Sequence, residues 1–250
     1  MEKVFSLNVN QLGAKMLEEY ATKFNALPKK DKKIREEEIR SLIKSGDELD
    51  ASKILDIVSP QGNFDVFISH YHENEKLALS VAAILKGKGY KPFVDSQYWL
   101  HFDAVAENLN NYHFHKDTKG SEVYDHSKTK MVQKHCDVML ISALSNVMAK
   151  CKYLIFINPP ENIIGIETYS KTDSASPKTY SPWIYWELIF AEILLKENKN
   201  SLRECKMFDA EDLPSIKYPL SVKNMIKLSV SDITTNKWAE KELKSDSNVL

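Results

Sequence analysis

The chain has 250 residues, of which 28% are charged, and a formal net charge of −1 at pH 7. This length fits one mid-sized domain with an addition and leaves little room for two full domains. Because acidic and basic residues nearly balance, composition does not favour binding to nucleic acid or to an anionic membrane.

The three cysteines, Cys136, Cys151 and Cys205, are widely spaced and include no C-x-x-C pair. An odd number at this spacing is not the disulfide framework of a small secreted protein. The first residues lack the apolar stretch of a signal peptide, and no apolar run reaches the roughly 18 residues of a transmembrane helix. We therefore expect a soluble, cytoplasmic protein without a membrane partner.

The first 60 residues predict helices. Large apolar residues recur at every fourth position from Leu12 to Phe24, which is the stripe of an amphipathic helix. A second, mostly solvated helix is predicted over 29–44 and a short third helix over 50–58. We expect residues 1–60 to form a helical N-terminal appendage, which could bind an upstream activator.

After Gly62 the pattern changes to strand, helix, strand. The apolar run over 64–69 predicts a buried strand, and apolar residues at helical spacing over 75–88 predict a helix that stops at Gly89. A second strand is predicted over 90–95, where Pro92 favours an edge position. Such a βαβ unit favours a parallel sheet with helices on both faces.

The residues from Asp95 to about Asp125 are expected to form an irregular loop. A long helix is predicted from there to Lys150. A central strand follows over 153–158, because this run is almost entirely apolar, as in strands that are covered on both faces.

A polar loop over 161–179 leads to another predicted helix, which Ser181 can cap and Pro182 can begin. Weaker patterns indicate strands at 205–208 and 226–230 and a closing helix over 236–244.

Trp183 and Glu187 lie one turn apart at the start of that helix and share a face. Such a face can hold a flat aromatic ligand against the indole, while the carboxylate meets a developing positive charge. A core indole and a buried, hydrogen-bonded glutamate would give the same pattern. The residues alone leave both interpretations open.

Taken in order, these segments resemble a Toll/interleukin-1 receptor (TIR) domain over residues 63–245. The resemblance rests on D-V-F-I-S at 65–69, on G-Y-K-P-F-V-D at 89–95, on the third strand ending in Asn158-Pro159, and on S-x-W-x-x-x-E at 181–187. It implies a flavodoxin-like, three-layer α/β fold with a parallel sheet of about five strands. The N-terminal helical appendage would precede this domain.

Ligands of such open sheets bind beyond the carboxyl ends of the strands. The resemblance implies that Glu187 is the catalytic glutamate that enzymatic TIR domains need to cleave the bond between nicotinamide and ribose in NAD+. NAD+ would be the substrate and not a cofactor, and the products would be nicotinamide and ADP-ribose or a cyclic isomer. The residues expected to bind NAD+ are Ser69, His70, Tyr71, Asp95, Trp99, Asn158 and Trp183.

The residue types fit this reaction. Nicotinamide leaves as a neutral molecule without being protonated, so one carboxylate can stabilise the oxocarbenium-like ribosyl group. Ordinary glycoside hydrolysis, in contrast, uses two carboxylates. Bacterial members of the family often act in antiphage defence signalling, which is the expected role here.

Two other functions stay open. One is a non-catalytic TIR module that signals by self-assembly through the loop at 95–99, and contacts between TIR domains are expected for the enzyme too. The other is a flavodoxin-like transferase that moves deoxyribose between bases through a glutamate. The chain also departs from the family, because His70-Tyr71-His72-Glu73 follows the first strand where many enzymatic members carry tyrosine or arginine.

The seven histidines all fall between His70 and His135, but none has the spacing of a strong zinc motif. We therefore expect no metal. The sequence also lacks a phosphate-binding G-x-x-x-x-G-K-S/T loop and a G-x-G-x-x-G fingerprint.

Overall fold

A computed structural model of the chain describes residues 1–9, 11–21, 37–42, 50–60, 62–113, 126–158, 178–179, 181–197, 218–219 and 225–235. The chain divides into two compact units. The first contains Met1–Phe24, Asn63–Val94 and Met148–Leu250, and the second contains Asn25–Gly62 and Asp95–Val147.

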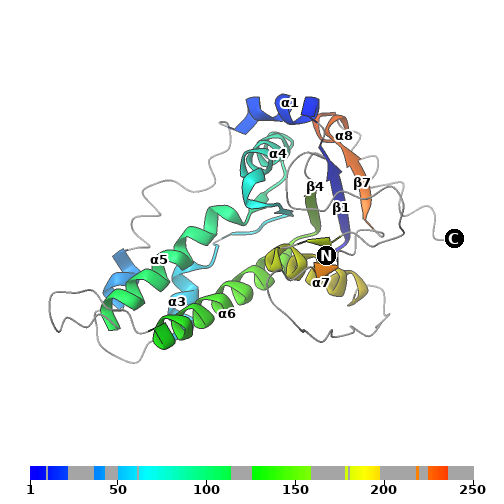
Figure 1. The fold of residues 1–250 in the computed structure, drawn as a ribbon. Coiled ribbons are helices and arrows are strands. Elements are labelled where there is room, and N and C mark those ends of the chain that lie inside the picture. Colours follow the sequence, from blue (N-terminus) through cyan, green and yellow to red (C-terminus); the bar gives the residue numbers. More distant parts are fainter. Residues whose placement is uncertain are drawn as a thin grey trace. The chain divides into compact units, whose positions relative to one another are not determined.

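The first unit is built on a five-stranded parallel sheet of order β3-β2-β4-β1-β7 (Figure 1). Strands β2 and β4 are buried along their described side chains, so both faces of the sheet are covered. This confirms the expected α/β architecture. The strands are β1 (Lys3–Asn8), β2 (Val66–Ser69), β3 (Pro92–Val94), β4 (Tyr153–Asn158) and β7 (Ile226–Ser229).

Two predicted strand positions are confirmed. β4 is the central strand, as its apolar run predicted. β3 is an edge strand and begins at Pro92, where the missing N–H of proline costs the sheet least.

The N-terminal strand β1 is the main departure from expectation. Lys3–Asn8 lies between β4 and β7, and Phe5 pairs in register with Ile155 on one side and Ile226 on the other. The prediction that residues 1–60 hold only helices is therefore wrong for this segment. The physical reason is its run of Val4, Phe5 and Leu7, whose burial in the sheet outweighs any helical alternative.

When β2 is numbered as strand 1, the sheet has the flavodoxin-like strand order 2-1-3-4-5, except that strand 4 comes from the start of the chain. Strands 1, 2, 3 and 5 of that order are β2, β3, β4 and β7. Strand 4, between β4 and β7, is β1 from the start of the chain. Residue 60 is thus not a boundary between an appendage and the sheet.

Three helices of the first unit pack together in Figure 1. α1 (Gln11–Ala21) contacts α4 (Glu75–Gly87), and α4 contacts α8 (Val230–Thr234). α4 follows a short 3-10 turn, η1 (His72–Asn74), and is followed by Gly89 at φ 90°, a conformation that favours glycine. The predicted helix and its stop are confirmed.

Helix α7 (Pro182–Glu197) begins where the sequence predicted. The Ile184 N–H donates to Ser181 Oγ at 3.3 Å, so Ser181 caps the helix. A short antiparallel pair, β5 (Lys178–Thr179) and β6 (Tyr218–Pro219), contacts α7.

The second unit is helical in its described residues. It holds a helical segment over 37–42, α3 (Ala51–Val58), α5 (Ser96–His113) and α6 (His126–Lys150) as far as residue 147. Asp50 caps α3 by accepting from the Ser52 N–H at 2.8 Å. The predicted helices α3 and α6 are confirmed.

Helix α5 corrects the expectation of an irregular loop after Asp95. Val105, Ala106 and Leu109 are buried at helical spacing and give α5 an apolar face. The neighbouring Asn108, Asn110 and Asn111 have low helix propensity, which hid this pattern.

Other predictions lie outside the described residues. These are most of the helix over 29–44, the loops over 114–125 and 161–177, the strand at 205–208 and the closing helix over 236–244. Within the described parts of the chain, no helix is long and apolar enough to cross a membrane.

Candidate functional site

The central contact of the candidate site joins Ser69 to Glu187. Ser69 is the last residue of β2, and Glu187 lies one turn inside α7. The Ser69 hydroxyl donates to Glu187 Oε2 at 2.6 Å, although the two residues are 118 positions apart. Both lie on the first unit, so the fold itself brings these two predicted site residues together.

Glu187 belongs to the buried face of α7. Ile184, Glu187, Leu188 and Ala191 are buried at intervals of three and four residues, which is one face of a helix. Glu187 is the only ionisable member of that set and is 1% exposed. A carboxylate in such a place needs hydrogen-bond donors, and the Ser69 hydroxyl supplies one.

The contact is a short hydrogen bond. Its 2.6 Å separation lies toward the short end of the range for a hydroxyl that donates to an oxygen. It ties the carboxyl group of Glu187 to the carboxyl end of β2.

His70 and Tyr71 continue the chain beyond Ser69 and are both buried. The Tyr71 ring lies 6.1 Å from that of Phe156, centroid to centroid. Phe156 is in turn the register partner of Ser69 on β4. His70 and Tyr71 are thus part of the packed interior at this edge of the sheet.

Trp183 is half-buried in the first turn of α7. Its spacing from Glu187 keeps the two on neighbouring parts of the helix surface. A second tryptophan, Trp186, stacks on Phe190 with ring centroids 5.4 Å apart and an interplanar angle of 10°. Trp183 is therefore not part of the fully buried face of α7.

The remaining predicted site residues are placed less directly. Asp95 is buried and begins the second stretch of the second unit. Trp99 lies on α5 of that unit, and only its backbone position is described. Asn158 ends β4, and only its backbone position is described. The described site therefore consists of residues from the first unit.

Sequence reasoning missed two further residues at the carboxyl ends of the strands. Asn8 ends β1 and pairs in register with Asn158 on one side and Ser229 on the other. Asn8 and Ser229 are both exposed. The signal for Asn8 was its position directly after the apolar β-rich run from Val4 to Leu7.

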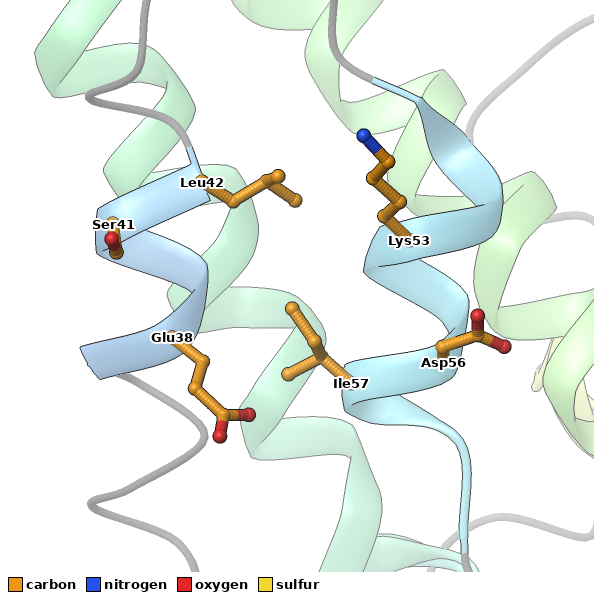
Figure 2. Close-up of a pocket in the computed structure, with 6 residues that line it drawn as sticks. All are labelled: Glu38, Ser41, Leu42, Lys53, Asp56 and Ile57. Carbon is orange, nitrogen blue, oxygen red and sulfur yellow. The ribbon is translucent and has the colours of Figure 1, made fainter.

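A groove in the second unit is separate from this site. It lies between the helical segment 37–42 and α3, where Leu42 and Ile57 point toward each other (Figure 2). Glu38, Lys53 and Asp56 add charge around this apolar centre.

Among the described residues, no group of three or more His, Cys, Asp or Glu side chains could hold a metal ion. No protein-family model, curated protein or solved structure matches the chain.

Proposed function

We propose that the protein is an NAD+ glycohydrolase of the TIR type that acts in antiphage defence signalling. Glu187 would stabilise the ribosyl cation as the bond between nicotinamide and C1′ breaks. Water would then add to C1′ and release a proton, which gives nicotinamide and ADP-ribose. If a group within the ADP-ribose attacked C1′ instead, the product would be a cyclic isomer.

The observation that carries this proposal is the hydrogen bond from Ser69 to Glu187. It holds a carboxylate at the carboxyl end of the first strand of the βαβ unit, which is the edge where open α/β sheets bind ligands. Its negative charge would become more favourable as positive charge develops on the ribose, which is the condition for electrostatic catalysis.

The burial of Glu187 sets a condition on this activity. Because the side chain is 1% exposed, C1′ can reach it only after the residues above it move apart. The proposed enzyme therefore works in an opened state, and self-assembly through TIR contacts would be one way to favour that state. An upstream activator bound to the N-terminal helices would be another.

A second candidate is a non-catalytic TIR module that signals by self-assembly. The same contact favours it, because a buried bond between β2 and α7 is also what a structural glutamate would make. The helix containing Glu187 would then be a scaffold element.

One experiment separates the two candidates. The purified protein is incubated with NAD+ at a series of protein concentrations, and nicotinamide, ADP-ribose and cyclic products are resolved by chromatography. The proposed enzyme releases nicotinamide at a rate per molecule that rises with assembly. A protein that assembles, as seen by light scattering, and releases none at any concentration is the non-catalytic module.

A further inference from the structure

Asn74 is a buried polar residue with no role in the contacts described above. It ends the η1 turn, five residues beyond the end of β2, and its side chain is 1% exposed. Neither Oδ1 nor Nδ2 of Asn74 has a hydrogen-bond partner among the described residues. A buried amide whose N–H donor and carbonyl acceptor are both unsatisfied costs stability, so we expect a ligand to supply the missing hydrogen bonds.

Helix capping does not supply that partner. Asn74 occupies the N-cap position of α4, where asparagine normally accepts a hydrogen bond from the helix N–H groups, but its side chain makes no capping bond. Its backbone N–H donates to Tyr71 O at 2.7 Å. Among the described residues, its side-chain amide thus keeps both a donor and an acceptor for a further partner.

Asn74 is preceded by exposed residues. The two preceding residues of the same turn, His72 and Glu73, are exposed. Because Asn74 itself is 1% exposed, a ligand can reach its amide only if the residues around it move apart. The turn also lies at the carboxyl end of β2, the edge that carries Ser69 and Glu187.

The charges around Asn74 indicate which ligand group it suits. Glu73 and Glu75 flank it, and together with Lys76 they leave one net negative charge on this stretch. This disfavours a phosphate at the N-terminus of α4, even though helix N-termini usually attract anions. It favours a neutral or cationic group, and the nicotinamide ring of NAD+ is cationic.

Resting on the proposed function, we infer that Asn74 recognises the carboxamide of the nicotinamide ring. An asparagine side chain offers an N–H donor and a carbonyl acceptor side by side, and a carboxamide offers the complementary pair. Two antiparallel hydrogen bonds then satisfy both amides. A carboxylate in place of the carboxamide offers no donor, and its negative charge meets Oδ1 and the flanking glutamates.

The test measures binding with turnover blocked. A Glu187→Gln chain is titrated calorimetrically with NAD+ and with its analogue that carries nicotinic acid in place of nicotinamide. We expect NAD+ to bind about 5- to 150-fold more tightly, the range expected when a buried hydrogen-bonding group loses its partner. Adding Asn74→Leu removes both the donor and the acceptor at nearly constant size and adds no charge, and it should abolish this preference.

Asn74→Ser is the second variant, because serine also caps helices and places no charge in the interior. Urea unfolding shows which of the two variants keeps the stability of the parent, and that variant is used for binding. A preference for NAD+ that survives the substitution of Asn74 overturns the inference. Equal binding of the two dinucleotides to the Glu187→Gln chain, or no binding of either, also overturns it. If the parent discriminates through Asn74 but the native chain releases no nicotinamide, the proposed reaction fails and the recognition site stands.

Discussion

The Ser69 hydroxyl and the Glu187 carboxylate form a 2.6 Å hydrogen bond that ties the end of β2 to the first part of α7. This bond joins the sheet to a helix that begins 113 positions after the end of β2, because the order of strands and helices brings both to one edge of the sheet. Its removal should affect stability as well as any chemistry at Glu187.

Replacing Ser69 with alanine removes a donor to a buried carboxylate. We expect Ser69→Ala to lower the free energy of unfolding by about 1–3 kcal/mol, the usual cost of leaving a buried polar group unsatisfied. Urea denaturation measures this loss.

Ser80→Ala is the matched control for that substitution. Ser80 is also fully buried, but its hydroxyl donates to the Lys76 carbonyl of its own helix at 2.8 Å. No charged group is left behind when this hydroxyl is removed, so the loss should stay below about 1 kcal/mol. Equal losses for the two variants would show that the contact between Ser69 and Glu187 has no special weight.

The position of β1 predicts that the segment from residue 63 onward does not fold without the N-terminus. A chain beginning at residue 63 would leave β4 and β7 without the strand that lies between them. We expect it to lose cooperative urea unfolding, which circular dichroism and tryptophan fluorescence can follow. Cooperative unfolding with the stability of the full chain would contradict the placement of β1.

A milder version of this test uses point substitutions in the same segment. Phe5 is fully buried, so Phe5→Ala should cost about 3–5 kcal/mol in unfolding free energy. Glu2 is exposed, and Glu2→Ala should change stability by no more than about 0.5 kcal/mol. Similar values for the two would place Phe5 outside the core.

Cys151 should resist alkylation in the folded protein. Burial and the nearby Asp65 carboxylate raise the pKa of its thiol to about 12, against a smaller opposing effect of the N-terminal amine. Since a raised pKa keeps the thiol protonated, almost no thiolate forms at about pH 8.5, where an ordinary cysteine is about half ionised. Peptide mass spectrometry after iodoacetamide treatment should find Cys151 unmodified until urea is added.

The same shift predicts how stability changes at alkaline pH. Above about pH 8.5 the unfolded chain loses the Cys151 proton while the folded chain retains it, so stability falls as pH rises toward 12. Cys151→Ala should make this fall less steep. Rapid labelling of Cys151 in the folded state, or an unchanged slope in the variant, would contradict its buried position beside Asp65.

The elements that sequence patterns predicted well are those with a strong local signal. The apolar run of β4 indicated a central strand, and Ser181 followed by Pro182 marked the start of α7. Both signals depend on a few neighbouring residues. They do not require knowledge of the rest of the fold.

The features that were missed depend on contacts between distant residues. β1 is too short for its pattern to decide between strand and helix, and its place in the sheet is set by pairing with β4 and β7. The bond between Ser69 and Glu187 is of the same kind. The sequence could place both residues near the same edge, but only side-chain geometry shows that one donates to the other.

The most direct test of the proposed reaction compares two substitutions on α7. Glu187→Gln keeps the shape of the buried side chain and removes its charge, whereas Glu192→Gln removes a partly exposed charge that pairs with Lys196 at 2.9 Å. Nicotinamide release from NAD+ is measured for both variants and for the native chain, under conditions in which all three are folded. We predict that Glu192→Gln retains the native rate and that Glu187→Gln releases nicotinamide at least about 100-fold more slowly, as is usual when an electrostatic catalytic group is lost. Release by Glu187→Gln at the native rate would contradict the assignment of Glu187 as the catalytic residue.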